Sequence, residues 1–344
     1  MSWEAGGVVL IVAFLVSAGA TLGLIRLLQS RGVLDLPNER SSHTRPTPRG
    51  GGVGLLGGVA AGLLVGHWLG VPLLASPLIG GVLLVALASF ADDYLGGVPL
   101  AVRAAAQVAA AALVVFQTGG FPRLPLPFPA DFPLGDLGIP LAILWIVGVT
   151  NVYNFLDGID GYAACQGVIT GTATAFLFPE AAYAGLALAG ACAGFLLFNW
   201  HPARIFLGDV GAASLGFLFA ALPFQVGSER RGQAVFLSVI CLWFFLSDGA
   251  FTLLRRLLRG EKVWKPHRSH LYQRLASTGL RHDQVVRAVC AAAALLAGLA
   301  VVSSFLDYAP FDWALLFVAV GFFLVYLLAT SAREARHRAS AGSP

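Results

Sequence analysis

The chain of 344 residues carries little charge: Asp, Glu, Lys and Arg make up 12% of it, against 57% hydrophobic residues. A soluble domain carries roughly 25% charged residues. This deficit excludes an ordinary soluble protein and predicts an all-α, polytopic membrane protein. A basic region before the first apolar run is also missing, and that run is too long for a cleaved leader. We therefore expect the N-terminal segment to be the first membrane-spanning helix.

Cysteine is scarce and isolated. The four Cys residues stand singly in apolar stretches, and none has the CxxC spacing of a zinc or redox site. Their spacing predicts that all four pack in the core. An internal repeat and a separate soluble segment are absent as well, so residues 1–344 are expected to form a single integral-membrane domain.

Eleven apolar segments approach the roughly 20 residues that a helix needs to cross a bilayer. Cytoplasmic loops of membrane proteins carry an excess of Lys and Arg. With the N-terminus outside and the C-terminus in the cytoplasm, all but three of the 22 cations fall on the inner side. The sequence therefore predicts about eleven spans with this orientation. The segments cover residues 4–28, 51–70, 73–91, 100–118, 138–156, 162–179, 182–199, 211–227, 233–256, 285–305 and 312–331.

Polar residues gather where the fifth apolar segment ends, in the sequence NVYNFLDGIDG at 151–161. Polar side chains are costly to hold in hydrocarbon, so such a cluster needs partners or a function. Asn151 and Asn154 are three residues apart, and so are Asp157 and Asp160, which would let each pair share a helix face. The two Gly residues permit close backbone approach to an ion or a phosphate. We expect a site for a metal and a phosphorylated substrate.

Three more carboxylates lie on the same predicted side of the membrane. Asp92 and Asp93 end the third segment. Neighbouring side chains on a helix diverge by about 100°, so one can face a reaction centre while the other orients a cation or an Arg. Asp209 begins the eighth segment, where it could cap the helix or bind a metal. We favour the metal, because Mg²⁺ needs only one or two protein oxygens beside substrate phosphates.

Two basic loops also fall on this side. The first contains Arg40, His43 and then RPTPRGGG at 45–52, whose cations and exposed N–H groups suit a diphosphate or a nucleotide. Lipid head groups would attract the same cations. The second contains Trp264, a candidate stacking residue, and HRSH at 267–270, which suits hydrogen bonding to a phosphate or a sugar better than zinc binding. Convergence of five motifs on one face predicts a single site.

Several polar residues near these motifs are expected to be structural. His201 and Arg204 precede Asp209, and His282 stands alone beyond the second basic loop. Asp248 lies within the ninth apolar segment, so it should face the interior of the helix bundle.

Taken together, DDYLGG at 92–97, NVYNFLDGIDG at 151–161 and FLGDVGAAS at 206–214 resemble the polyprenyl-phosphate N-acetylhexosamine-1-phosphate transferases, glycosyltransferase family 4. The resemblance covers nearly the whole chain, from PTPRGGG at 46–52 to HRSH at 267–270. It implies roles for three sets of residues. The catalytic set is Asp92, Asp93, Asp157 and Asp160; the metal set is Asp209 and Asn154; the substrate-binding set is Asn151, Arg103, Arg45, Thr47, Arg49, His267, Arg268 and His270.

The implied reaction transfers N-acetylhexosamine 1-phosphate from a UDP-sugar to undecaprenyl phosphate and releases UMP. It would need Mg²⁺, with Mn²⁺ as an alternative, and would take place at the cytoplasmic face of the inner (plasma) membrane. The expected partners are the UDP-N-acetylsugar, the lipid acceptor and membrane lipid, with no nucleic acid; relatives suggest a homodimer. The product would initiate a cell-surface glycan such as O-antigen. Direct attack by the acceptor phosphate with Asp92 as base is favoured over a covalent Asp intermediate.

The second basic loop bears on the donor sugar. HRSHLYQRL has Leu271 where the HxHH motif of the phospho-MurNAc-pentapeptide translocase and of the enterobacterial common-antigen initiator has its last His. The loop is similar instead to initiators of O-antigen and capsule synthesis that transfer 6-deoxy-N-acetylhexosamine phosphates. The expected donor carries GlcNAc or a 6-deoxy-N-acetylhexosamine, with MurNAc-pentapeptide as the alternative. A secondary transporter is the alternative from another class, but its site should lie near the membrane midplane, often between repeats.

Overall fold

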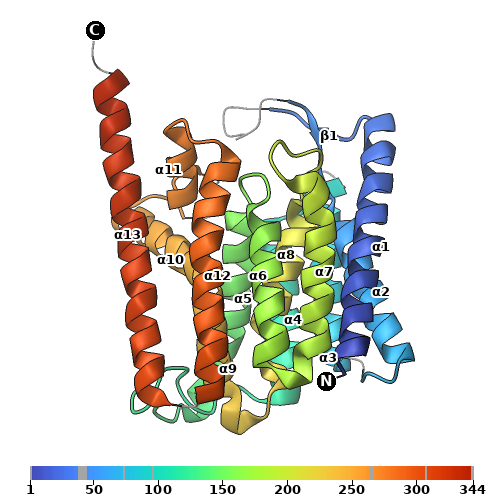
Figure 1. Ribbon diagram of the computed structural model, residues 1–344, viewed down its shortest axis with the longest axis vertical. Helices are drawn as coiled ribbons and strands as arrows, with labels where there is room; N and C mark the ends of the chain where they lie inside the picture. The colour runs from blue at the N-terminus through green and yellow to red at the C-terminus, as the bar shows by residue number, and fades with distance from the viewer. Residues whose placement is uncertain are drawn as a thin grey trace.

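The computed structural model describes residues 2–37, 45–72, 74–94, 97–263, 267–306 and 308–341. The predicted loop residues Arg40, His43 and Trp264 lie outside these ranges. The described chain is almost entirely helical, and most of its helices run side by side (Figure 1). The helices are α1 (Trp3–Ser30), α2 (Gly52–Trp68), α3 (Ser76–Tyr94), α4 (Leu100–Thr118), α5 (Gly138–Leu156), α6 (Tyr162–Leu177), α7 (Ala182–Asn199), α8 (Gly208–Ala221), α9 (Ser228–Cys241), α10 (Trp243–Leu258), α11 (Leu271–Ser277), α12 (His282–Leu306) and α13 (Ala309–Ala341).

All eleven predicted apolar segments are helical, and α4, α5 and α7 have the predicted bounds. The prediction of one continuous helix over 233–256 is wrong, because α9 and α10 meet at Leu242 with a bend of 79°. The short helix α11 and the two-stranded sheet of β1 (Leu34–Asp35) and β2 (Thr47–Pro48) were not predicted. They lie in the two basic loops, for which no regular structure was predicted.

Seven helical segments of the described chain are long and apolar enough to cross a membrane, or eight if the bent pair α9–α10 counts as one span. Helix α2 is apolar but shorter. These lengths and compositions fit a multi-pass membrane protein. They do not confirm eleven spans, because α6 and α8 have only 16 and 14 residues.

Helix α8 lies at the centre of the bundle, where it packs against α2, α3 and α5. Its sequence GDVGAASLGFLFAA is apolar on all sides, as expected of a helix that other helices surround. Every residue of α8 is buried except Asp209. The central helix therefore presents one carboxylate, at its first turn.

Glycine lets α2 and α8 meet backbone to backbone. A Cβ atom on Gly52 would lie 2.3 Å from the Cα of Gly211, closer than real Cβ contacts occur. The Gly52 N–H also donates to the Leu207 carbonyl at 2.8 Å. This contact fixes the start of α2, and with it the preceding PTPRGGG segment, against the start of α8.

The polar motifs gather at one end of the bundle. In Figure 1 that end carries β1, α11 and the C-terminus, and the N-terminus lies at the opposite end. This convergence agrees with the expectation of one site at one membrane face.

Candidate active site

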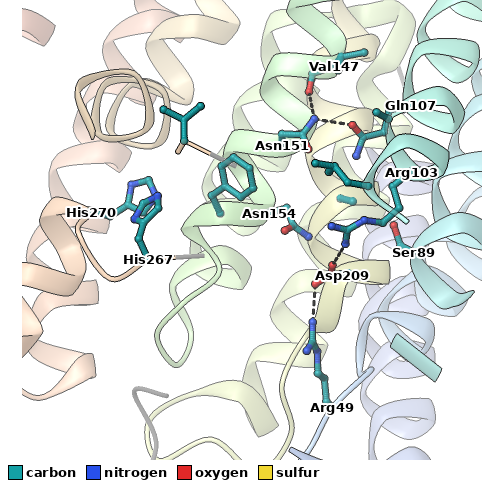
Figure 2. A pocket seen from close by; sticks show the side chains of 15 residues that line it. Arg49, Ser89, Arg103, Gln107, Val147, Asn151, Asn154, Asp209, His267 and His270 are labelled. Carbon is teal, nitrogen blue, oxygen red and sulfur yellow. Dashed lines mark hydrogen bonds and ion pairs between the residues drawn. The ribbon is translucent and has the colours of Figure 1, made fainter. Parts of the chain in front are cut away.

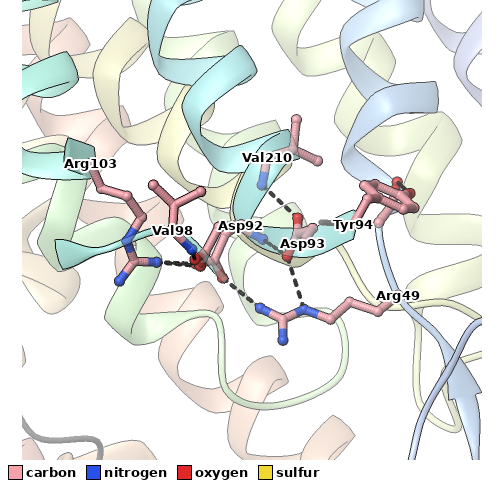
Figure 3. A network of polar contacts seen from close by, with 9 residues as sticks. Arg49, Asp92, Asp93, Tyr94, Val98, Arg103 and Val210 are labelled. Atoms are coloured by element: carbon pink, nitrogen blue, oxygen red, sulfur yellow. Dashed lines mark hydrogen bonds and ion pairs between the residues drawn. The ribbon is translucent and has the colours of Figure 1, made fainter. Parts of the chain in front are cut away.

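The core of the site is a network of three carboxylates and two guanidinium groups (Figure 3). Arg49 reaches Asp93 at 3.2 Å and Asp209 at 2.6 Å. Arg103 reaches Asp92 at 2.5 Å and Asp209 at 2.9 Å. Asp209 is thus bridged to both members of the Asp92–Asp93 pair through one Arg each. These five side chains, predicted from three separate motifs and α4, form one site.

The two neighbouring carboxylates of α3 have different partners, as their divergence on a helix predicts. Asp93 is 1% exposed and accepts hydrogen bonds from the N–H groups of Asp209 at 3.2 Å and Val210 at 3.0 Å. It therefore caps the first turn of α8, whose own N-terminal residues provide no side-chain cap. Because Asp93 performs the capping, the oxygens of Asp209 point to Arg49 and Arg103 instead. The side chain of Asp209 therefore does not cap α8, which was the alternative role that the sequence suggested.

Asp92 faces the other way. Its carboxylate accepts the Val98 N–H at 2.7 Å and the Arg103 guanidinium. The bond to Val98 holds the loop between α3 and α4 close to the helix end. Asp92 thereby orients Arg103, which points across to Asp209 (Figure 2).

A cavity of about 540 Å³ opens beside this network (Figure 2). Its polar wall combines residues from the first basic loop, α4, α5, α8 and the second basic loop, whereas Leu100, Ala104 and Val147 form an apolar part. An elongated ligand with a charged head and an apolar tail would suit such a lining. Seven predicted site residues line the cavity: Arg49, Arg103, Asn151, Asn154, Asp209, His267 and His270.

Gln107 is a lining residue that the sequence analysis missed. Its Oε1 atom accepts a hydrogen bond from Asn151 Nδ2 at 2.6 Å, and the same amide donates to the Val147 carbonyl at 2.8 Å. Asn151 is therefore held by its neighbours, and Asn154, one turn further, faces the cavity. Sequence offered little signal for Gln107, a single amide within an Ala-rich helix.

The expectation that Asp157 and Asp160 share a helix face is wrong. Helix α5 ends at Leu156, and Asp157 is its C-cap with φ −81° and ψ 58°. Asp160 is buried in the loop before α6, whose N-cap residue is Gly161 at φ 78°. The DG dipeptides are turn signals and explain why the helix stops.

Asp160 belongs to a second cluster. Its Oδ2 atom lies 2.6 Å from Nδ1 of His201 and 3.3 Å from Nδ1 of His282, and it accepts the Ala203 N–H at 3.2 Å. Burial would raise the pKa of Asp160, but the hydrogen bonds from His282 and His201 outweigh it and hold the pKa below its usual value. His201 and His282, which looked structural in the sequence, are thus the direct partners of a predicted catalytic residue.

Three predicted substrate-binding residues lie away from the cavity wall. Arg45 is exposed, and Thr47 is buried in β2 with its hydroxyl donating to the Arg45 carbonyl at 3.0 Å. Arg268 lines a neighbouring pocket of about 420 Å³ together with His282. Substrate contacts from these three would need a ligand that extends beyond the 540 Å³ cavity.

Two groups of residues have the composition of a metal site. Asp92, Asp93 and Asp209 supply carboxylate oxygens, with the Asn154 amide on the same cavity, and such hard ligands fit Mg²⁺. Asp160, His201 and His282 bring three ligand atoms within 4.8 Å of one another. Two imidazole nitrogens and one oxygen suit Zn²⁺ rather than Mg²⁺. The oxygen-only group is therefore where the chain fits Mg²⁺.

Asp157 predicts a pH dependence of metal binding. Its burial raises the pKa to about 7; Arg49 lowers the pKa in part, and Asp209, Asp93 and Asp160 add to the rise. A bound cation favours the charged carboxylate, so binding below pH 7 must expel a proton. Mn²⁺ affinity, followed by electron paramagnetic resonance, should fall up to about tenfold per pH unit below 7 and level off near pH 8. Asp157→Asn should flatten the dependence of Mn²⁺ affinity on pH. An unchanged slope in that variant would show that Asp157 is not the group that causes it.

The comparisons with known proteins agree with the site. Residues 75–227 match glycosyl transferase family 4. A Bacillus subtilis protein named probable undecaprenyl-phosphate N-acetylglucosaminyl 1-phosphate transferase is 30% identical over 80% of this chain and 80% of its own length. The decaprenyl-phosphate N-acetylglucosaminephosphotransferase of Mycobacterium tuberculosis is 28% identical over 77% of this chain and 74% of its own. A phospho-N-acetylmuramoyl-pentapeptide-transferase of Synechococcus is 31% identical over 81% and 85%.

The chain forms a multi-pass helical bundle with an Asp/Arg network at one end. Beside the network lies a cavity whose lining is part polar and part apolar. These features suit an enzyme that transfers a phosphate group to a lipid in the membrane. The chain belongs to the polyprenyl-phosphate N-acetylhexosamine-1-phosphate transferases of glycosyl transferase family 4.

Proposed function

We propose that the protein transfers N-acetylglucosamine 1-phosphate from UDP-N-acetylglucosamine to undecaprenyl phosphate, in a Mg²⁺-dependent reaction that initiates a cell-surface glycan. The observation that carries the proposal is the position of Asp209. It is the only residue of α8 that is not buried, it contacts both Arg49 and Arg103, and it lines a cavity with one apolar wall. A lipid phosphate and a nucleotide diphosphate need such a place to meet.

Charge explains how the network would work. Three carboxylates and two guanidinium groups leave one net negative charge, which attracts a divalent cation before any phosphate arrives. The carboxylates of Asp92, Asp93 and Asp209 would hold Mg²⁺, which would neutralise phosphate charge and stabilise the departing UMP. Each Arg can then exchange a carboxylate partner for a phosphate oxygen, because phosphate and carboxylate fit the same guanidinium fork.

The acceptor phosphate is already an anion, so direct attack on the sugar-bearing phosphorus needs little activation. A new bond forms between the acceptor oxygen and that phosphorus, and the bond to the bridging oxygen breaks, so UMP leaves with the electron pair. Both oxygens of Asp92 are engaged by Val98 and Arg103. We therefore propose that Asp92 orients Arg103 at the acceptor phosphate and does not act as the base, the role that the sequence suggested.

The membrane placement follows from charge and geometry together. All cations except Arg123, Arg230 and Arg231 fall on the predicted inner side of an eleven-span topology, and the site lies at that end of the bundle. We therefore propose that the site faces the cytoplasm, where UDP-sugars are made, and that the protein resides in the inner membrane.

The donor is inferred from the relatives and from Leu271. Two of the relatives above carry N-acetylglucosamine in their names. Leu271 is fully buried, and its N–H donates to Asp248 at 2.9 Å. It offers no polar side chain where peptidoglycan-type enzymes have a His. MurNAc-pentapeptide transfer is the second candidate, supported by the Synechococcus relative; a 6-deoxy-N-acetylhexosamine is a variant of the first.

A donor panel tests the proposal. Purified protein, undecaprenyl phosphate and Mg²⁺ are incubated with UDP-N-acetylglucosamine, with UDP-linked 6-deoxy-N-acetylhexosamines or with UDP-MurNAc-pentapeptide, and UMP is quantified. We expect UMP from UDP-N-acetylglucosamine, only when lipid acceptor and Mg²⁺ are both present. Release from the pentapeptide donor alone would establish the second candidate, and release from none would refute the transferase proposal.

A further inference from the structure

Asp248 is a fully buried carboxylate outside the Asp/Arg network. It lies in α10, five residues after that helix begins at Trp243, beyond the 79° bend. Its Oδ1 atom accepts from Thr252 at 3.1 Å, from Nδ1 of His270 at 3.1 Å and from the Leu271 N–H at 2.9 Å. Its Oδ2 atom accepts from the Tyr272 N–H and the Tyr326 hydroxyl, both at 3.2 Å. Five donors from α10, α11, α13 and the second basic loop thus converge on one side chain.

These bonds give His270 a defined tautomer and orientation. An ionised carboxylate can only accept, so the proton of the hydrogen bond lies on Nδ1 of His270. The bonds to Leu271 and Tyr272 fix the backbone directly after His270, so the imidazole ring cannot move independently of Asp248. The opposite ring nitrogen, Nε2, must therefore point away from Asp248.

Nε2 of His270 is buried and has no hydrogen-bond partner among the described residues. The His270 side chain is only 2% exposed, yet it lines the 540 Å³ cavity that Arg103, Asn154 and Asp209 also line. Figure 2 shows His270 across the cavity from Asp209, with Asn154 between them. A buried polar nitrogen without a partner is costly, and a ligand in this cavity would remove the cost.

A purely structural role accounts for less of this arrangement. The His270 ring stacks on Tyr272, with centroids 5.8 Å apart, and lies 4.9 Å from the His267 ring. The stacking needs only a flat ring, and the bond to Asp248 needs only Nδ1, so neither contact accounts for the buried Nε2. The neighbouring His267 differs, because its Nδ1 is 2.9 Å from the Ser269 hydroxyl.

We propose that Asp248 is a positioning residue, which holds His270 so that Nε2 binds the diphosphate of the nucleotide donor. The proposal rests on the proposed function only in taking the ligand to be a nucleoside diphosphate. When Nε2 carries a proton it donates to a phosphate oxygen, while Nδ1–H stays on Asp248. Arg49 and Arg103 then contact the ligand from the opposite wall of the cavity.

Binding of UDP in the presence of Mg²⁺ tests the proposal independently of turnover and of the sugar. Calorimetry on the purified full-length protein compares the parent with Asp248→Asn, His270→Gln and the double variant. We expect His270→Gln to weaken UDP binding roughly tenfold, a typical loss for one charge-assisted hydrogen bond. Asp248→Asn should weaken binding by a similar factor, and the double variant should be no weaker than His270→Gln, since Asp248 acts through His270.

Asp312→Asn is the matched control, because Asp312 is also a buried carboxylate bonded to a hydroxyl, that of Ser303, but lies at the opposite end of the bundle. It should bind UDP as the parent does. Thermal melting of each variant shows whether the fold persists. Three outcomes would each overturn the proposal. The losses of UDP affinity in the two single variants could multiply in the double variant, His270→Gln could bind UDP as the parent does, or the parent could bind no UDP. A parent that binds UDP but releases no UMP from any donor would refute the transferase function alone.

Discussion

Asp209→Asn is expected to lower kcat roughly 1,000-fold, which corresponds to about 4 kcal/mol of transition-state stabilisation. The substitution keeps the shape of the side chain but removes the charge that Arg49 and Arg103 share and that a hard cation requires. The two Arg residues lose a partner and become freer to hold phosphate. We therefore expect the KM for the donor to stay the same or fall, although kcat falls strongly. Steady-state UMP release over a range of Mg²⁺ concentrations measures both constants.

The matched control is Asp131→Asn. Asp131 is likewise paired with an Arg, Arg123, at 2.8 Å, but in the connection between α4 and α5 at the far end of the bundle. Its variant should turn over at the parental rate. If Asp209→Asn retained parental kcat at every Mg²⁺ concentration, Asp209 would not be a metal ligand.

Gly52→Val is expected to destabilise the protein by more than about 3 kcal/mol, at or beyond the upper end of ordinary overpacking costs. The added atoms would meet the backbone of Gly211 on the central helix, which cannot rotate away as a side chain can. Any accommodation must shift α8 against α2, and with it Asp209 against Arg49. Stability and activity should therefore fall together, as measured by thermal melting in detergent and by UMP release.

Gly57→Val provides the comparison on the same helix. A Cβ atom at Gly57 meets nothing within 4 Å, so the same substitution has room there. Its melting temperature should stay within a few degrees of the parent. Equal loss of stability in both variants would show that the cost comes from the β-branched residue in α2 and not from the contact with α8.

The sequence was sufficient to predict that four charged residues share one site, because membrane topology sorts loops onto two sides. Once the eleven apolar segments are placed, Asp92, Asp93, Arg49 and Asp209 fall on one side, and the structure joins all four in one network. Their pairing was not predictable, since Arg49 and Asp209 are 160 residues apart and nothing local selects one carboxylate over another. The capping of α8 by Asp93 has the same long-range origin.

Two errors have different causes. The break at Leu242 follows neither a Pro nor a Gly, so the continuous apolar pattern predicted one helix where the structure has a bend. The end of α5 at Leu156, by contrast, was signalled by the DG turn that follows, and the spacing of Asp157 and Asp160 was wrongly given more weight. His201 and His282 could not be recognised, because only the folded chain brings them to Asp160.

We predict that a sugar phosphate, and not a sugar alone, moves to the lipid. UDP-N-acetylglucosamine labelled with ³²P at the phosphorus next to the sugar distinguishes the two, when the lipid and aqueous products are separated after incubation with undecaprenyl phosphate and Mg²⁺. We predict that the label appears in the lipid fraction and that UMP is released without label. Label that stays in an aqueous UDP product, with unlabelled sugar on the lipid, would contradict the account.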